Sequence, residues 1–128
     1  MGLYNFQSRF VPKILSGEKT HTIRSVRAHP DKPGNLLHLY TGLRTKNAKR
    51  LMRATCVKVE EIAILLAPGN FLDDDAQCVF VDIDGVVLHR SECEALARRD
   101  GFESFAEMLD FWEGRLPFHG HIVHWRAA

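Results

Sequence analysis

Residues 14–24 read ILSGEKTHTIR, and this stretch holds the pattern that decides the fold. Pro12 suits the first turn of a helix and Gly17 suits its end, so the spacing predicts one short helix over 11–17. Polar and apolar side chains then alternate over 20–24, which indicates a strand leaving that helix. The sequence therefore predicts a short helix that is followed directly by a strand.

The sequence patterns before and after this helix and strand predict an α+β protein. Alternating and β-branched residues indicate several strands, and two Ser-x-x-Glu patterns, typical of helix starts, indicate two late helices. The expected strands are 4–10, 36–40, a long bent strand over 52–66, a hairpin over 79–88 with Asp84-Gly85 as its turn, and 119–125; the expected late helices are 91–99, capped by Ser91 with Glu94, and one starting at Ser104 with Glu107.

Composition describes one ordinary globular domain. The chain has 128 residues, of which 45% are apolar and 26% charged, so we expect a single domain over 1–128 with a packed core. The formal net charge is only +1, but residues 44–53 read RTKNAKRLMR while residues 73–75 are three aspartates. A basic run in a nearly neutral chain predicts one positive face.

Cysteines and hydropathy suggest the compartment. The three cysteines, at positions 56, 78 and 93, form no CxxC pair, which argues against a disulfide scaffold and against a cysteine zinc site. The sequence shows no signal-peptide pattern and no apolar run near the roughly 18 residues that span a bilayer. We therefore expect a cytoplasmic protein without membrane contact, and the sequence indicates no protein partner.

Several segments together resemble the ASCH family of the PUA-like superfamily. Residues 17–24 fit its G-x-K-x-x-x-x-R signature, and residues 32–37, KPGNLL, are similar to its K-x-G-D-x-L entry into a strand, with asparagine replacing the usual aspartate. Residues 97–102, ARRDGF, resemble its acidic-Gly-Phe segment between late helices. The resemblance implies a small PUA-like β-barrel of about five or six strands, with a short early helix and a helical pair before the last strand.

The resemblance also implies an activity. Some small single-domain ASCH proteins are amidohydrolases that deacetylate N(4)-acetylcytidine with a lysine, a threonine and a downstream carboxylate. Carried onto this sequence, these residues are Lys19, Thr22 and Asp100. The family enzymes have glutamate at the third place, and aspartate is one methylene shorter. Glu94 and Glu103 are therefore alternative sources of the carboxylate.

The chemistry is consistent with these residue types. Amide hydrolysis needs a nucleophile, a group that takes and returns a proton, and stabilisation of the oxyanion. Thr22 offers a hydroxyl, and Lys19 could act as a base if burial and Arg24 lower its pKa. Residues three apart on a strand face opposite sides, so Lys19 must lie in the turn before the strand to meet Thr22.

A second function class stays open. Related domains bind RNA, so the same cleft could belong to a non-catalytic RNA-binding module. In either case Arg24 and His21, together with Arg44 and Lys46 from the basic run, are the candidate residues for binding a nucleoside or nucleotide substrate, or single-stranded RNA. No cofactor and no metal is expected.

Three other patterns favour structural interpretations. Residues 79–86, VFVDIDGV, look like the nucleophile motif of haloacid-dehalogenase-type phosphatases, but only 43 residues follow position 85, so a hairpin is expected instead. His119, His121 and His124 form an HxHxxH cluster that we interpret as plain strand histidines. Aromatic and apolar residues over 105–112 have helical spacing, which favours core positions over a base-stacking platform.

Overall fold

The computed structural model describes residues 2–67 and 78–128 and shows a small mixed α+β protein. One seven-stranded sheet and three short helices, one of them preceded by a 3-10 turn, make up the described chain. In chain order the elements are β1 (Gly2–Phe6), η1 (Ser8–Phe10), α1 (Val11–Ser16), β2 (His21–Ser25), β3 (Leu36–Thr41), β4 (Lys49–Ala67), β5 (Cys78–Ile83), β6 (Val86–Val87), α2 (Arg90–Arg99), α3 (Phe105–Trp112) and β7 (Phe118–Ala127).

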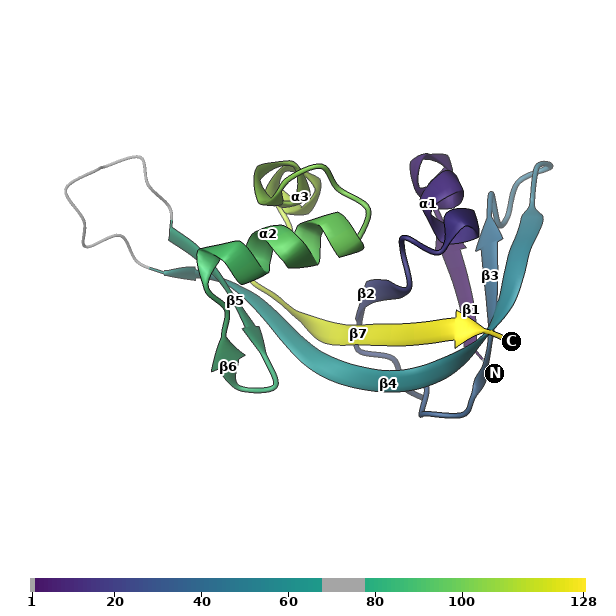
Figure 1. Ribbon diagram of the computed structural model, residues 1–128, viewed down its shortest axis with the longest axis horizontal. Helices are drawn as coiled ribbons and strands as arrows, with labels where there is room; N and C mark the ends of the chain where they lie inside the picture. Colours follow the sequence, from purple (N-terminus) through teal and green to yellow (C-terminus); the bar gives the residue numbers. More distant parts are fainter. Residues whose placement is uncertain (1, 68–77) are drawn as a thin grey trace.

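Strand β4 is the long bent strand that the sequence predicts, and it organises the sheet. It is 19 residues long and pairs antiparallel with β3, β5 and β7. Register shifts near Cys56 and near Leu39 in its partner β3 place bulges in these ladders. Bulges bend a strand and increase its twist. In Figure 1, β4 and β7 accordingly run side by side as one curved ribbon along the molecule.

The sheet is not closed into a barrel, which corrects the expected barrel of five or six strands. Its path runs β1-β3-β4-β5-β6, with β7 joining β4 and β2 joining β7. Closure requires a continuous ladder of backbone hydrogen bonds. Between β1 and β2 the described residues have side-chain bridges instead: Arg24 donates to the carbonyl of Asn5 at 2.6 Å, and Arg27 to that of Leu3 at 3.0 Å.

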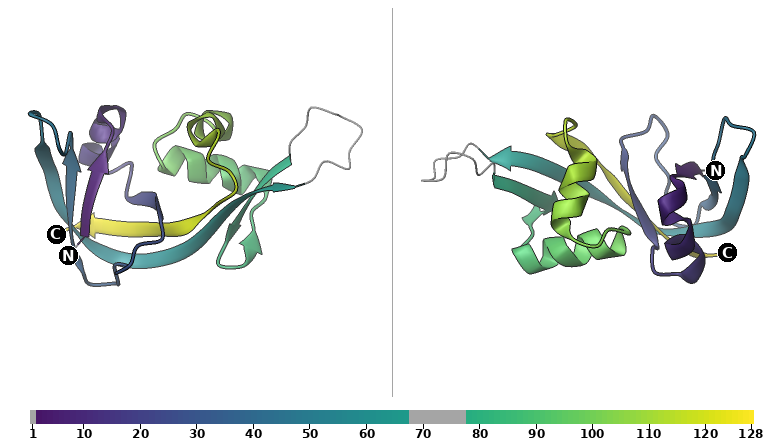
Figure 2. Two further views of the ribbon diagram at one scale, coloured as in Figure 1. Left: turned by 180° about the vertical axis from the view of Figure 1, so that it is seen from behind. Right: turned by 90° about the horizontal axis from the view of Figure 1, so that it is seen from above.

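The helices lie in two groups on one side of the β4–β7 ribbon. Figure 1 shows α1 above the end that carries β1, β2 and β3, and α2 with α3 above the end that carries β5 and β6. The two further views in Figure 2 agree with this arrangement. Segments that are far apart in the sequence approach each other between these two groups. The site described below lies there.

The core runs continuously beneath both helical groups. Its least exposed members come from β1, β3, β4, β5 and β7, from all three helices and from the turn after α2. Burying large apolar side chains from every element is the main force that holds a small domain together. The largest fully buried side chains are Tyr4, Ile14, Leu37, Leu39, Cys56, Ile64, Val81, Leu96, Phe102, Met108 and Ile122.

Local signals at the hairpin and at α3 are confirmed. β5 pairs antiparallel with β6 across Asp84-Gly85, both with positive φ, as a tight two-residue turn requires. This antiparallel hairpin is incompatible with the strand of a phosphatase-type parallel sheet. Ser104 caps α3, because its hydroxyl accepts a hydrogen bond from the amide of Glu107 at 3.1 Å.

Most element boundaries lie within three residues of the predictions, and two differences concern how an element ends or begins. The first strand ends at Phe6 rather than at residue 10, because a 3-10 turn follows. Helix α2 begins one residue early, with His89 and Glu92 forming its capping box. Glu94 does not complete a box with Ser91, because its carboxylate accepts a hydrogen bond from the Phe105 amide at 3.0 Å instead. Within the described ranges, no helix has the length and hydropathy to cross a bilayer.

Candidate functional site

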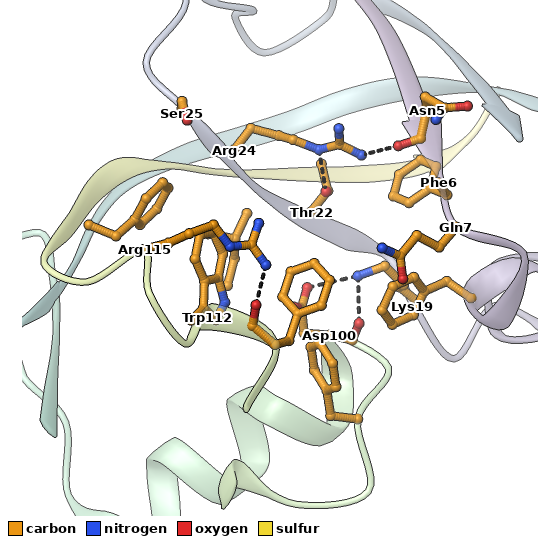
Figure 3. A pocket seen from close by; sticks show the side chains of 15 residues that line it. Asn5, Phe6, Gln7, Lys19, Thr22, Arg24, Ser25, Asp100, Trp112 and Arg115 are labelled. Atoms are coloured by element: carbon orange, nitrogen blue, oxygen red, sulfur yellow. Dashed lines mark hydrogen bonds and ion pairs between the residues drawn. The ribbon is translucent and has the colours of Figure 1, made fainter. Parts of the chain in front are cut away.

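A cavity of about 490 Å³ opens between the two helical groups. That volume lies within the range of small-molecule sites. Figure 3 shows side chains from β1, β2, α3 and the chain around Asp100 converging on it. Its polar lining includes Lys19, Thr22, Arg24 and Asp100, and its apolar lining includes Phe6, Phe10, Phe102, Phe111, Trp112 and Phe118.

Lys19 lies in the turn between α1 and β2, as its spacing from Thr22 requires. Gly17 ends α1 in the left-handed conformation (φ 85°), and the Lys19 amide then donates to the carbonyl of Lys13 at 3.0 Å. The Lys19 side chain is only 4% exposed. Its Nζ donates to the Asp100 carbonyl at 2.6 Å and to Asp100 Oδ1 at 2.7 Å.

Asp100 is held at the C-terminal end of α2, where the chain turns through Gly101. Its amide closes the last turn of the helix by donating to the Leu96 carbonyl at 2.9 Å. Its carboxylate contacts Lys19 and also lies 3.2 Å from Nε2 of His21, without the angle of a hydrogen bond. Asp100 and Lys19 therefore form a buried ion pair that joins residues 81 apart.

Burial acts on both partners of this ion pair. Burial lowers the pKa of the Lys19 ammonium below its ordinary value, and the charge of Asp100 offsets only part of that effect. Burial alone would raise the pKa of Asp100, but Lys19 and His21 outweigh it, so that pKa is lowered. The carboxylate thus stays ionised, while the lysine gives up its proton more easily than a lysine in water.

Thr22 and Arg24 lie beside the ion pair on β2. The Thr22 hydroxyl accepts a hydrogen bond from Nε of Arg24 at 2.9 Å, so its own proton is directed elsewhere. Arg24 also donates from Nη2 to the Asn5 carbonyl, which leaves three of its five N–H groups without an acceptor in the described chain. Its guanidinium centre lies 4.9 Å from the centre of the Phe6 ring, which fixes its orientation.

His21 extends the polar cluster into the sheet rather than into the cavity. It is buried, does not line the cavity, and faces its cross-strand partner His124 with ring centres 5.3 Å apart. His124 contacts Glu60 Oε1 through Nε2 at 2.5 Å. Burial lowers the pKa of His124, and the hydrogen bond to Glu60 opposes that change. His21 is therefore placed to act on Asp100 and not directly on a ligand.

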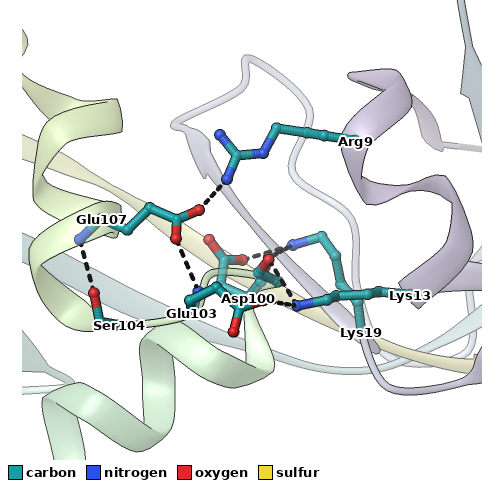
Figure 4. Close-up of polar contacts among 8 residues, drawn as sticks. Arg9, Lys13, Lys19, Asp100, Glu103, Ser104 and Glu107 are labelled. Carbon is teal, nitrogen blue, oxygen red and sulfur yellow. Dashed lines mark hydrogen bonds and ion pairs between the residues drawn. The ribbon is translucent and has the colours of Figure 1, made fainter.

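A set of polar contacts joins the two helical groups around this cavity (Figure 4). Lys13 donates to the Gly101 carbonyl at 3.2 Å and lies 3.7 Å from a carboxylate oxygen of Glu103. Arg9 forms an ion pair with Glu107. Together with Lys19 and Asp100, these contacts hold η1 and α1 against the start of α3.

The other sequence candidates lie outside the cavity. Arg44 and Lys46 are exposed in the loop between β3 and β4 and do not line it. Glu94 is occupied with the amide of Phe105, and the side chain of Glu103 is 83% exposed. Of the three carboxylates considered, Asp100 is the one that lines the cavity beside Lys19.

The histidine cluster of β7 divides between two environments. His119 and His121 line a second, shallower hollow of about 270 Å³, together with Glu61, Asp82 and Asp84, whereas His124 contacts Glu60. Asp82 and Asp84 accept hydrogen bonds from the backbone amides of Gly85 and Glu61, both at 2.8 Å. Over 2–67 and 78–128, no three His, Cys, Asp or Glu side chains are grouped closely enough to hold a metal ion.

Sequence reasoning missed the aromatic wall and one cation. Phe111 and Trp112 belong to the helical pattern that we interpreted as core, and Trp112 is indeed buried, but both also line the cavity. The indole N–H of Trp112 has no acceptor among the residues that the structure describes. Arg115 lines the cavity from the turn before β7. The sequence marks Arg115 only as part of a short turn that contains glycine. Such turns occur in most surface loops, so this pattern does not indicate a site.

Fold and cavity together define a small α+β protein with a buried ion pair inside an aromatic-walled pocket. Comparison of the chain with protein-family models, with curated protein sequences and with solved structures finds no match. What the pocket does must therefore be argued from its own chemistry.

Proposed function

We propose that this protein is an amidohydrolase that deacylates an N(4)-acylated cytosine nucleoside such as N(4)-acetylcytidine, on a fold related to ASCH and PUA-like domains. The observation that carries the proposal is the buried Lys19–Asp100 ion pair opening on the same aromatic-lined cavity as Thr22. Perturbed titratable groups beside a hydroxyl in a cavity are typical of a catalytic site. Aromatic walls suit a flat base.

Each polar residue has a distinct part in this reaction. Thr22 Oγ1 attacks the acyl carbonyl carbon while neutral Lys19 accepts the hydroxyl proton. Arg24, whose remaining N–H groups lie beside Thr22, stabilises the resulting oxyanion. The intermediate collapses by breaking the C–N bond, and the Lys19 ammonium returns its proton to the departing amine of cytosine.

A second half-reaction regenerates the enzyme. Water attacks the acyl-threonine ester, Lys19 accepts a proton from that water, and the ester C–O bond breaks. The proton returns to Thr22, and acetate leaves as the second product. Asp100 keeps Lys19 in place through both halves, because its carboxylate and its carbonyl both accept hydrogen bonds from Nζ.

The placement of the charges favours an enzyme over an RNA-binding module. A module that binds RNA gains most of its affinity from phosphate contacts along an extended basic surface. Arg44 and Lys46, the candidates for such a surface, do not line the cavity. Lysine buried with its counter-charge is better suited to handling a proton than to attracting a polyanion.

Acetate release from N(4)-acetylcytidine by wild type, Thr22→Val and Thr22→Ser tests this proposal. Valine keeps the shape of threonine but removes the hydroxyl, so we expect kcat/KM to fall by about 10³-fold or more. Serine keeps the hydroxyl and should retain a measurable rate. Thr20→Val is the matched control, because Thr20 is exposed and lies outside the cavity.

Two outcomes would contradict the proposal. Equal rates for Thr22→Val and Thr22→Ser would remove Thr22 from the chemistry. Wild-type protein that binds single-stranded RNA at micromolar concentration or tighter, yet releases no acetate, would instead favour the RNA-binding module.

A further inference from the structure

Of the described cations that line the cavity, Arg115 is the one that the proposed hydrolysis does not use. It lies in the turn at 113–117 between α3 and β7, where Gly114 has a φ of 77° and the Arg115 amide donates to the Trp112 carbonyl at 2.9 Å. Figure 3 shows its side chain on the Trp112 side of the cavity, away from Lys19. The backbone of the turn is thus fixed so that the guanidinium borders the cavity.

The guanidinium of Arg115 lies against two aromatic rings, and most of its N–H groups have no acceptor in the described chain. Its central carbon lies 4.4 Å from the ring centre of Phe111 and 4.8 Å from that of Trp112. One N–H donates to the Phe111 carbonyl, which leaves four donors. No carboxylate of the described chain lies within 4.0 Å of it. An arginine held between two aromatic rings and a backbone carbonyl keeps N–H groups with which it can bind an anion through two hydrogen bonds.

The positive charge of the cavity lining also favours an anionic ligand. Among the residues that the structure describes, three cations line the cavity, Lys19, Arg24 and Arg115, against one carboxylate, that of Asp100. When Lys19 is protonated, it and Asp100 neutralise each other, so the charges of Arg24 and Arg115 remain without a counter-charge from the lining. A neutral nucleoside leaves them uncompensated, whereas a phosphomonoester carries close to two negative charges at neutral pH.

We propose that the substrate is a phosphorylated nucleoside, an N(4)-acylcytidine monophosphate, whose phosphate is bound by Arg115 at the rim of the cavity while its base faces Lys19 and Thr22. This inference rests on the proposed function and narrows its substrate class. A cavity of about 490 Å³ accommodates one nucleotide between the aromatic side chains and the ion pair. The phosphate is the shared chemistry of the 5′- and 3′-monophosphates, and the experiment compares the two.

Steady-state kinetics on N(4)-acetylcytidine and on its 5′- and 3′-monophosphates test the proposal. For wild type we expect KM for one monophosphate to be about 10- to 100-fold lower than KM for the nucleoside. One or two hydrogen bonds between charged groups increase affinity by about this factor. In Arg115→Gln this ratio of KM values should fall towards one. Arg115→Lys, which keeps the charge but loses the planar fork, should give an intermediate ratio.

Arg27→Gln is a matched control. Arg27 also stacks on an aromatic ring, with its guanidinium carbon 4.0 Å from the ring centre of Tyr4, and also donates to a backbone carbonyl. It does not line the cavity. We expect Arg27→Gln to keep the wild-type ratio of KM values, which separates loss of phosphate binding from loss of a stacked surface arginine. Urea unfolding of each variant verifies that it is folded.

A binding measurement by calorimetry distinguishes failure of this inference from failure of the proposed function. The ligands are cytidine and its 5′- and 3′-monophosphates. Monophosphate binding that is tighter than cytidine binding and is weakened by Arg115→Gln would support the phosphate site even without acetate release. Acetate release with equal KM values for nucleoside and monophosphates would overturn the phosphate site and leave the hydrolase. Equal loss of affinity for cytidine and its monophosphates in Arg115→Gln would also overturn it.

Discussion

At the scale of single residues, Lys19 and Asp100 control each other's ionisation. Lys19 is buried, which makes its ammonium form costly, and the negative charge 2.7 Å away is the main influence that stabilises that form. Leaving one member of a buried pair without the other is strongly unfavourable. The proton on Lys19 is therefore sensitive to any change at Asp100.

Asp100→Asn should move the pH dependence of hydrolysis to lower pH. In the proposed reaction the rate requires neutral Lys19, so kcat/KM should rise with pH through the pKa of that residue. Asparagine removes the negative charge that raises this pKa, so the pKa falls further and the rising limb shifts towards acid. The measurement is a pH profile of kcat/KM for wild type and variant.

Glu103→Gln is the control for that profile. Glu103 is an exposed carboxylate three residues from Asp100 in the sequence, and its ion pair is with Lys13. Its removal should leave the rising limb in place. A limb that stays fixed in Asp100→Asn, or that moves towards alkaline pH, would show that Asp100 does not set the ionisation of the base.

Individual residues of the site were predictable where a local pattern marks them. Lys19 and Thr22 were named from the resemblance of residues 17–24 to a family motif, and the turn after Gly17 allows both to line the cavity. Asp100 was one of three candidates, and only the packing of α2 against the α1 turn distinguishes it from Glu94 and Glu103. Arg115 was missed because its importance arises from contacts with Phe111 and Trp112 and from the cavity it borders.

At the scale of elements, the end of α2 shows how closely a turn can be fitted to its neighbours. Gly101 has a φ of 105°, and a Cβ built on it would lie 2.7 Å from Cδ1 of Phe10 and 3.5 Å from Cδ of Lys19. The chain can therefore pass close to the α1 group only because this position has no side chain. That close passage is what brings Asp100 to Lys19.

Gly101→Ala should cost more stability than Gly17→Ala. Both positions have positive φ, but a Cβ at Gly17 meets nothing within 4 Å. Gly17→Ala therefore reports backbone strain alone, about 1 kcal/mol. Gly101→Ala adds a steric clash with Phe10, for an additional 1–3 kcal/mol or so in the free energy of unfolding. Urea denaturation of both variants measures the difference, and equal losses would show that the turn has room.

Elements with strong local signals were predicted well, and their pairing was not. The Asp84-Gly85 turn, the Ser104 cap and the long strand β4 depend on nearby residues, so the sequence reveals them. The path of the sheet depends on which strands meet. β1 lies parallel to β3, and β2 pairs with β7 from the other end of the described chain. Alternation of side chains reports that a strand exists but not its neighbour.

At the scale of the whole molecule, the basic run at residues 44–53 contributes no side chain to the cavity lining. The basic run lies in the β3–β4 loop and the first part of β4, outside the cavity that holds Lys19 and Thr22. Arg44 and Lys46 are exposed, and salt screens the interactions of exposed charges. The loop should therefore have little influence on a ligand already bound in the cavity.

Reversing two of these charges tests that separation. We expect Arg44→Glu combined with Lys46→Glu to keep kcat/KM on N(4)-acetylcytidine within about twofold, because neither residue lines the cavity. The measurement is acetate release at low and at physiological salt. A large loss of kcat/KM at both salt concentrations would place the loop at the site. A loss of RNA affinity alone would identify a separate binding surface.

The pairing of β2 with β7 has a consequence for how the protein is made. In the described structure β7 is the only strand that β2 pairs with, and Asp100 follows Lys19 by 81 residues. At roughly 5–20 residues per second, a ribosome needs about 4–16 seconds to make that interval. During this time a nascent chain carries Lys19 and Thr22 without the carboxylate or the strand that would hold them. The pocket therefore assembles only after synthesis has passed β7, and a partly made chain has no working site.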